Sequence, residues 1–274
     1  MDQQGLLAVI KATERKYDGT FHVAVTDLRG GESFELRAHQ PRPTASAFKL
    51  CVLCELFRQS REEGLDLNAP IACHRAFLRP GDGVLRVMRP GQTLTAYNLA
   101  VLMMIVSDNT ATAELVNLVG ADRVTRTMQS LGLKDTDIHQ GLPGGAWAAR
   151  MRQPVSSAYD LCRLMTLIYR HELLTPRDCK DILRIMRANR MNDMLPRYIP
   201  VGEDWGDAQE WIANKIGYGD CRVDVGVVHA RNIIYATGLF FKPRRAPRAR
   251  FKCLADYPPI LAMAEVSLAI FQSI

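Results

Sequence analysis

Apolar and polar residues alternate near both ends of the chain, and this period-two pattern predicts strands. The stretch 20–27 alternates in this way, and 33–36 follows it after the turn Arg29-Gly30-Gly31, which predicts an antiparallel hairpin. Segments rich in β-branched residues predict three further strands, over 211–216, 223–229 and 233–241. Amphipathic patterns predict helices over 5–16 and 258–272.

The middle of the chain is predicted to be mainly helical. From about Leu65 to Asn189, capping residues and terminating glycines delimit helices at 95–106, 110–119, 122–131, 156–171 and from Thr175-Pro176 onward. Strands at both ends with helices between them predict an α/β (α+β) fold, with one antiparallel sheet built from both termini and flanked by helices. We place the discontinuous sheet domain at 1–62 and 196–274, an inserted all-helical domain at 63–195, and the active site in the cleft between them.

One predicted helix carries a candidate reactive pair. An apolar run from Phe48 to Phe57 predicts a buried helix that starts at Ser46 and ends before Gly64. Ser46 and Lys49 are three residues apart, so in a helix their side chains share one face. A serine at a helix N-terminus beside a buried lysine is a nucleophile with an adjacent base. An N-cap serine followed by a surface lysine gives the same residues, so this motif alone does not decide.

Composition narrows the functional classes. The chain has 274 residues, and 35 basic against 29 acidic residues give a net charge of +6, which is too small and too dispersed to indicate nucleic-acid binding. The densest basic run, 242–252, contains prolines and is predicted to be a solvated loop rather than a binding arm. No apolar stretch is long enough to span a membrane, and no secretory signal is visible, so we expect no membrane partner.

The cysteines and histidines point away from metal chemistry. Seven scattered cysteines fit a reducing cytoplasm, the expected location, although a trimmed secreted form would look the same. Cys51 and Cys54 fall inside the apolar helix and are predicted to pack in the core rather than to bind metal. The six histidines show no His-Glu-x-x-His spacing and there is no phosphate-binding loop, so we expect neither a metal nor a cofactor. The expected partner is a small acyl substrate, and a monomer is favoured.

Three short motifs occur in a fixed order: Ser46-x-x-Lys49, Ser107-Asp108-Asn109 and Lys215-Ile216-Gly217. In these motifs the chain resembles the serine β-lactamases and penicillin-binding proteins, class A in particular, which use S-x-x-K, S-D-N and K-T-G. The resemblance covers roughly residues 20–270 and includes the segments 80–95 and 224–228. In that family the first serine heads a buried helix, the second motif separates two helices, and the third lies on a strand beside the nucleophile.

The resemblance implies catalytic roles for Ser46, Lys49, Ser107 and Lys215. Ser46 would attack a carbonyl group and form an acyl-enzyme, with neutral Lys49 as the base. Ser107, assisted by Lys215, would pass a proton to the leaving group. The backbone N–H groups of Ser46 and Tyr218 would form the oxyanion hole. The implied substrate-binding residues are Asn109, which would hold the substrate amide, and Ile216, Gly217 and Tyr218.

Two departures from the family pattern bear on function. Class A enzymes carry a glutamate, followed by an asparagine, that activates the deacylating water, but 134–155 contains neither residue type. Without that base, a penicilloyl-enzyme is expected to hydrolyse slowly. Ile216 stands where a threonine or serine is usual, which removes a donor for a substrate carboxylate and adds bulk. Arg222 is the candidate replacement cation, and the glycine-rich stretch 141–145 suggests a reshaped pocket.

Three functions are compatible with these residues. The favoured one is a serine acyl hydrolase or acyl transferase that works through an acyl-enzyme on Ser46, with an ester or amide as substrate. The alternatives are a true class A-type β-lactamase or a slowly deacylating penicillin-binding protein. A further alternative is a non-catalytic binding protein on the same fold, although the retention of all four catalytic side chains argues against it.

Overall fold

A five-stranded antiparallel sheet joins the two ends of the chain. The computed structural model describes all residues except 75–76, 90, 139–152, 202–208, 231 and 245–255. The strand order is β2-β1-β9-β8-β7, so the N-terminal hairpin pairs directly with the last strand. The bounds are β1 Gly19–Asp27, β2 Ser33–Leu36, β7 Trp211–Tyr218, β8 Arg222–His229 and β9 Ile234–Pro243. The predicted antiparallel sheet from both termini is therefore confirmed, with strand ends within one or two residues of the prediction.

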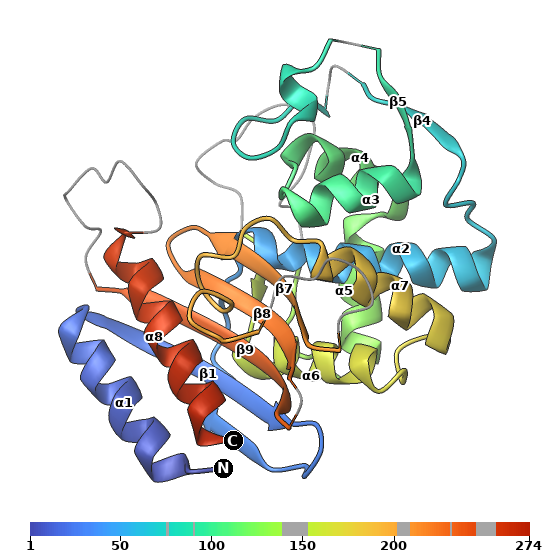
Figure 1. Ribbon diagram of the computed structural model, residues 1–274. Helices are drawn as coiled ribbons and strands as arrows, with labels where there is room; N and C mark the ends of the chain where they lie inside the picture. Colours follow the sequence, from blue (N-terminus) through green and yellow to red (C-terminus); the bar gives the residue numbers. More distant parts are fainter. Residues whose placement is uncertain (75–76, 90, 139–152, 202–208, 231, 245–255) are drawn as a thin grey trace.

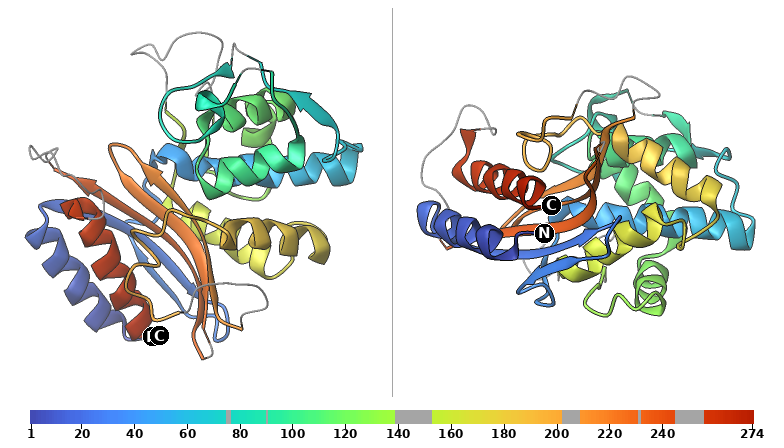
Figure 2. Two further views of the ribbon diagram at one scale, coloured as in Figure 1. Left: turned by 45° about the horizontal axis from the view of Figure 1, so that its top comes forward. Right: turned by 60° about the horizontal axis from the view of Figure 1, so that its bottom comes forward.

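Helices cover both faces of this sheet (Figures 1 and 2). Helices α1 (Gln3–Lys16) and α8 (Pro258–Ser273) lie side by side on the outer face, and Asp2 N donates to Ser273 O at 2.7 Å. The outer core contains Leu6, Val23 and Leu239. On the inner face a second core surrounds α2 (Lys49–Glu63) and includes Val225 and Phe240, which alternate along their strands with outward-facing residues. Cys51 and Cys54 are buried in this inner core, as predicted.

The remaining helices follow the predicted capping signals. Their bounds are α3 Ala96–Ile105, α4 Asn109–Val119, α5 Ala121–Ser130, α6 Ala158–Tyr169 and α7 Pro176–Arg187. The side chains of Thr95, Ser157 and Thr175 each accept a hydrogen bond from the backbone of the first turn that follows. Among the described residues, no helix is long and apolar enough to cross a membrane.

The segment 63–195 is not purely helical. It contains the short strands β4 (Pro70–Ala72) and β5 (Thr93–Thr95), which pair with each other, and β6 (Val155–Ser156), which pairs with β3 (Arg42–Pro43). Helix α6 packs against β1, β8 and β9, so it covers the inner face of the sheet. The predicted division into a sheet domain and a helical domain stays a prediction. Helices α3 and α4 lie above α2, on the side away from α1 and α8 (Figure 1).

The helix predicted from Ser46 begins three residues later. Helix α2 runs over Lys49–Glu63 and ends at Gly64, whose φ of 74° gives the left-handed C-cap that the glycine predicted. Ser46 lies in the preceding 3₁₀ turn η1 (Ala45–Phe48), in which Ala47 N donates to Thr44 O at 3.1 Å. Short 3₁₀ turns are common at helix N-termini, and here the turn fixes Ser46 just outside the α-helix.

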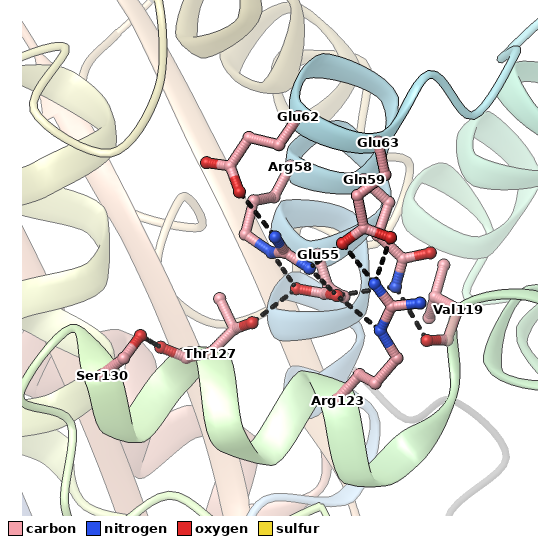
Figure 3. Close-up of polar contacts among 9 residues, drawn as sticks. All are labelled: Glu55, Arg58, Gln59, Glu62, Glu63, Val119, Arg123, Thr127 and Ser130. Atoms are coloured by element: carbon pink, nitrogen blue, oxygen red, sulfur yellow. Dashed lines mark hydrogen bonds and ion pairs between the residues drawn. The ribbon is translucent and has the colours of Figure 1, made fainter.

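A buried carboxylate fastens α2 to α5 (Figure 3). Glu55 has no exposed side-chain surface and accepts hydrogen bonds from Arg58, Gln59 and Thr127 at distances between 2.6 and 2.8 Å. Arg123 of α5 approaches the same carboxylate at 3.9 Å. Because α2 carries Lys49 at its first turn, this contact helps to fix the helix that supports the candidate site.

Candidate active site

The turn that carries Ser46 packs directly against strand β7. A Cβ atom on Gly217 would lie 2.2 Å from Thr44 O and 3.1 Å from Ala47 N, so only glycine allows this backbone approach. Ala45 has a φ of 44°, a left-handed conformation that is uncommon outside glycine. The structure therefore gives a steric reason for glycine at position 217: it allows β7 to lie close to the backbone of η1.

Lys49 lies under this turn in a nearly closed environment. It is 1% exposed. Its Nζ donates to Ser107 O at 2.6 Å, to Ser107 Oγ at 3.0 Å and to Asn109 Oδ1 at 2.8 Å. The first and second predicted motifs therefore meet, although they are about 60 residues apart in sequence.

Ser107 connects the two candidate lysines. Its φ of 55° is a left-handed conformation, rare for a non-glycine residue, in the break between α3 and α4. Its Oγ lies 3.0 Å from Lys49 Nζ and 3.1 Å from Lys215 Nζ. Lys215 comes from β7, has no exposed surface and also donates to Ile216 O at 3.1 Å. The structure thus joins Lys49, Ser107 and Lys215 by direct hydrogen bonds.

Burial makes both lysines easier to deprotonate. Removal from solvent, and then the charge of Lys215, hold the pKa of Lys49 well below the ordinary lysine value of 10.5. Burial lowers the pKa of Lys215 to about 8, although the carboxylates of Asp224 and Asp82 act in the opposite direction. A lysine held near neutrality can accept a proton, which is the property that the predicted base requires.

Ser46 Oγ forms no hydrogen bond with any residue that the structure describes. The expected base contact from Lys49 to Ser46 is therefore not made, because Lys49 Nζ is engaged by Ser107 and Asn109. Catalytic hydrogen bonds often form only when substrate is bound, and the role of Lys49 as the base stays a prediction. Ser46 is half-buried, and its hydroxyl is not committed to a structural role among the described residues.

The S-D-N motif also has a structural function that the sequence did not reveal. Asp108 is the N-cap of α4, and its second carboxylate oxygen accepts from Val84 N at 2.6 Å and Leu85 N at 2.9 Å. Asn109 donates through Nδ2 to Pro80 O at 2.8 Å, while its Oδ1 faces Lys49. Both side chains fasten the loop before η3 (Leu85–Val87) to the site. The predicted contact of Asn109 with a substrate amide stays a prediction.

Comparison with known proteins agrees with the predicted family. The sequence model of the beta-lactamase enzyme family matches residues 6–274. The chain belongs to the beta-lactamase enzyme family. No curated protein sequence matches it.

Solved structures share this beta-lactamase fold over almost the whole chain. A β-lactamase from Sphaerobacter thermophilus superposes with a TM-score of 0.87 at 23% identity, covering 99% of this chain and 97% of that one. PBP-A superposes with a TM-score of 0.83 at 26% identity, covering 99% and 96%. A mutant of PBP-A, solved as an acyl-enzyme complex with penicillin G, gives a TM-score of 0.80 at 24% identity over 98% and 95%.

In this beta-lactamase family member Ile216 does not line the site, although the sequence predicted that its side chain would add bulk there. Its side chain is 1% exposed and belongs to the outer core, so it adds no bulk to the surface of the site. Tyr218, at the end of β7, donates through its hydroxyl to Asp193 at 2.9 Å. Arg222 lies over the rings of Tyr218 and Tyr257, at 5.9 and 5.0 Å, and donates to the backbone of the β7–β8 turn. Arg222 therefore stays near the predicted oxyanion residue Tyr218.

A buried carboxylate supports the strand of Lys215 in this family member. Asp224 pairs with Ile216 across β7 and β8, has no exposed surface, and accepts from Leu195 N at 2.9 Å and from Asn214 Nδ2 at 3.0 Å. Burial raises the pKa of its carboxyl to about 7, although these hydrogen bonds and the charge of Lys215 oppose the shift. Its signal in the sequence is a single aspartate within a run of β-branched residues.

Most of the segment 134–155, on which the prediction of slow deacylation rests, lies outside the described residues. The glycine-rich stretch 141–145 and most of the basic run 242–252 also lie outside them. The absence of a glutamate over 134–155 is a property of the sequence, and its consequence stays a prediction. Among the described residues, no group of three or more histidines, cysteines or carboxylates could hold a metal ion.

Proposed function

We propose that this protein is an active-site-serine acyl hydrolase or acyl transferase that forms an acyl-enzyme on Ser46. One observation supports the proposal most: Ser107 Oγ contacts both Lys49 Nζ and Lys215 Nζ, at 3.0 and 3.1 Å, in a buried site beside the turn of Ser46. A chain of two lysines and a hydroxyl can move a proton between a nucleophile and a leaving group.

In the proposed acylation, Ser46 Oγ attacks the carbonyl carbon of an ester or amide while neutral Lys49 takes its proton. The backbone N–H groups of Ser46 and Tyr218 stabilise the oxyanion. In other enzymes a donor of this kind lowers the activation free energy by about 3 kcal/mol. The leaving group receives the hydroxyl proton of Ser107, and Lys49 Nζ, 3.0 Å from Ser107 Oγ, returns its proton to Ser107. The bond between the carbonyl carbon and the leaving atom breaks. Water, or another acceptor, then releases the acyl group from Ser46.

The substrate class of the proposal is an ester or an amide without a β-lactam-type carboxylate. The sequence supports it through Ile216, which offers no hydroxyl donor where class A enzymes have one. The burial of its side chain leaves only backbone groups of that residue to meet a ligand.

A second candidate is a β-lactamase or a slowly deacylating penicillin-binding protein. Membership of the beta-lactamase enzyme family and the 26% identity to PBP-A favour it. Because a PBP-A mutant forms an acyl-enzyme with penicillin G, that compound is a suitable first β-lactam probe. A cytoplasmic location, a monomeric state and the lack of nucleic-acid or membrane partners stay predictions from the sequence.

Hydrolysis of a short-chain 4-nitrophenyl ester tests the proposal. Wild type should exceed the uncatalysed rate, Ser46→Ala should fall to it, and Ser60→Ala, a serine at the far end of α2, should keep the wild-type rate. Equal rates for wild type and Ser46→Ala would remove the proposal. A chromogenic cephalosporin separates the second candidate: many turnovers indicate a β-lactamase, and a stoichiometric burst that then stops indicates penicillin binding.

A further inference from the structure

The loop 80–83 is pressed against the S-D-N motif through two glycines. A Cβ on Gly81 would lie 2.7 Å from Asn109 Nδ2, and a Cβ on Gly83 would lie 2.3 Å from the carboxyl carbon of Asp108. Both glycines have left-handed backbones, with φ of 94° and 108°. Over 81–83, therefore, Asp82 is the position that has room for a side chain.

The backbone of Asp82 is fixed while its side chain is exposed. Its carbonyl oxygen accepts a hydrogen bond from Asn109 N at 3.1 Å. Its carboxylate forms no hydrogen bond or ion pair with any residue that the structure describes. Asn109 in turn accepts from Lys49 at 2.8 Å, so Asp82 is separated from the candidate base by a single residue. This carboxylate is held at the edge of the site and faces solvent.

The charge of Asp82 reaches the catalytic side chains. Burial dominates the lowered pKa of Lys49 and of Lys215, and in both cases the carboxylate of Asp82 opposes the shift. Burial also dominates the raised pKa of Tyr218, to which Asp82 contributes. Three side chains from two other elements therefore lie within the electrostatic range of a carboxylate that has no ion-pair partner among the described residues.

We propose that Asp82 selects substrates whose acyl group carries an ammonium group, which it binds as an ion pair at the edge of the site. This inference rests on the proposed acyl-enzyme function. We place the ammonium group on the acyl part of the substrate because the backbone of Asp82 accepts a hydrogen bond from Asn109, the residue predicted to hold the amide of that part. A carboxylate whose backbone is fixed and whose oxygens are unpaired is suited to bind a cation, because little conformational freedom is lost when the ion pair forms.

Two substrate pairs that differ only by the ammonium group test the proposal. The first pair is the 4-nitrophenyl esters of N-phenylacetylglycine and N-phenylglycylglycine, which keep an amide on the acyl side, and the second is benzylpenicillin and α-aminobenzylpenicillin. For each pair, the ratio of acylation rates is measured for wild type, Asp82→Asn and Asp66→Asn. Asp66 is an exposed aspartate just beyond the far end of α2, a helix that spans about 20 Å from Lys49, and serves as the matched control.

Asp82→Asn should reduce the preference for the ammonium compound by about fivefold, as expected for one partly exposed ion pair. Asp66→Asn should keep the wild-type ratio. The wild-type preference should also fall as ionic strength rises from 0.02 to 0.5 M, roughly the range over which salt screens exposed charges. Comparing ratios cancels the different intrinsic reactivity of the two compounds.

The outcomes separate this inference from the proposed function. An unchanged ratio in Asp82→Asn, with both compounds still dependent on Ser46, would overturn the role of Asp82 alone. Equal slowing of both compounds would also overturn it, because Asp82 would then act on the lysines rather than on the substrate. Rates of Ser46→Ala equal to those of wild type would instead remove the acyl-enzyme function.

Discussion

Replacing Gly217 by alanine should slow acylation by more than its effect on stability explains. The added Cβ would lie 2.2 Å from Thr44 O, a backbone atom, whereas ordinary contact begins at 3.4 Å. Strand β7 and turn η1 must therefore move apart by roughly 1 Å. The proposed oxyanion donors, Ser46 N and Tyr218 N, lie on these two elements. A misplacement of this size can cost about 100-fold in rate, so we expect acylation of Ser46 to slow by about that factor.

Gly238→Ala is the matched control for this change. Its Cβ would lie 2.2 Å from Ala158 O, the same overlap with a backbone carbonyl. It is on β9, which β8 separates from β7, so it lies about 10 Å from that strand. Both variants should lose about 1–3 kcal/mol of unfolding free energy in urea, as expected for an overpacked core.

Acylation is followed by intact mass or by 4-nitrophenol release, under conditions in which both variants are folded. Only Gly217→Ala should acylate slowly. If Gly217→Ala reacts at the wild-type rate, or if Gly238→Ala slows by the same factor, the argument that η1 and β7 jointly form the oxyanion site is wrong.

Three further predictions concern buried charges. Glu55→Ala should cost about 3 kcal/mol in urea unfolding because it removes a buried acceptor shared by Arg58, Gln59 and Thr127. Glu62→Ala, which removes an exposed partner of the same Arg58, should cost less than about 1 kcal/mol, and similar losses would contradict this reading. Asp224 has a pKa raised to about 7 from 3.8, so the native state keeps its proton longer than the unfolded chain does. Wild type should therefore lose stability relative to Asp224→Asn as pH rises from about 4 to about 7, by up to about 4 kcal/mol, and parallel stability curves would refute it. Because Lys49 must be neutral to act as base and its pKa is well below 10.5, the acylation rate should rise with pH and level off well before pH 10; a rate that still climbs beyond pH 10 would exclude it as the base.

Local signals predicted most of the fold. Thr95 and Thr175 cap the helices they were expected to cap, Ser157 caps the helix predicted from about residue 156, and Gly64 ends α2 in a left-handed conformation. The β-branched segments near the C-terminus form the three strands predicted there. These features depend on a few neighbouring residues, so a single sequence contains enough information to identify them.

Tertiary contacts determine what the sequence left out. The 3₁₀ turn at Ser46 is packed against Gly217, a residue about 170 positions away, and no local pattern reports that contact. Asp108 belongs to the S-D-N motif and Asp224 to an apolar strand segment, but the residues that donate hydrogen bonds to them come from distant parts of the chain. Ile216 is a different case, because alternation along the predicted strand already places it on the face opposite Lys215, in the outer core. Motif spacing identified the catalytic candidates but not the residues that hold them in place.

Peptide mapping of a covalent adduct tests the central claim most directly. Wild type and Ser46→Ala are incubated with penicillin G and with a 4-nitrophenyl ester, quenched in acid and digested, and the mass of the peptide that contains Ser46 is measured. The account predicts that this peptide gains the mass of the acyl group in wild type and gains nothing in Ser46→Ala. Wild-type protein that turns the ester over without acylation of Ser46, or that is acylated at another residue, would contradict it.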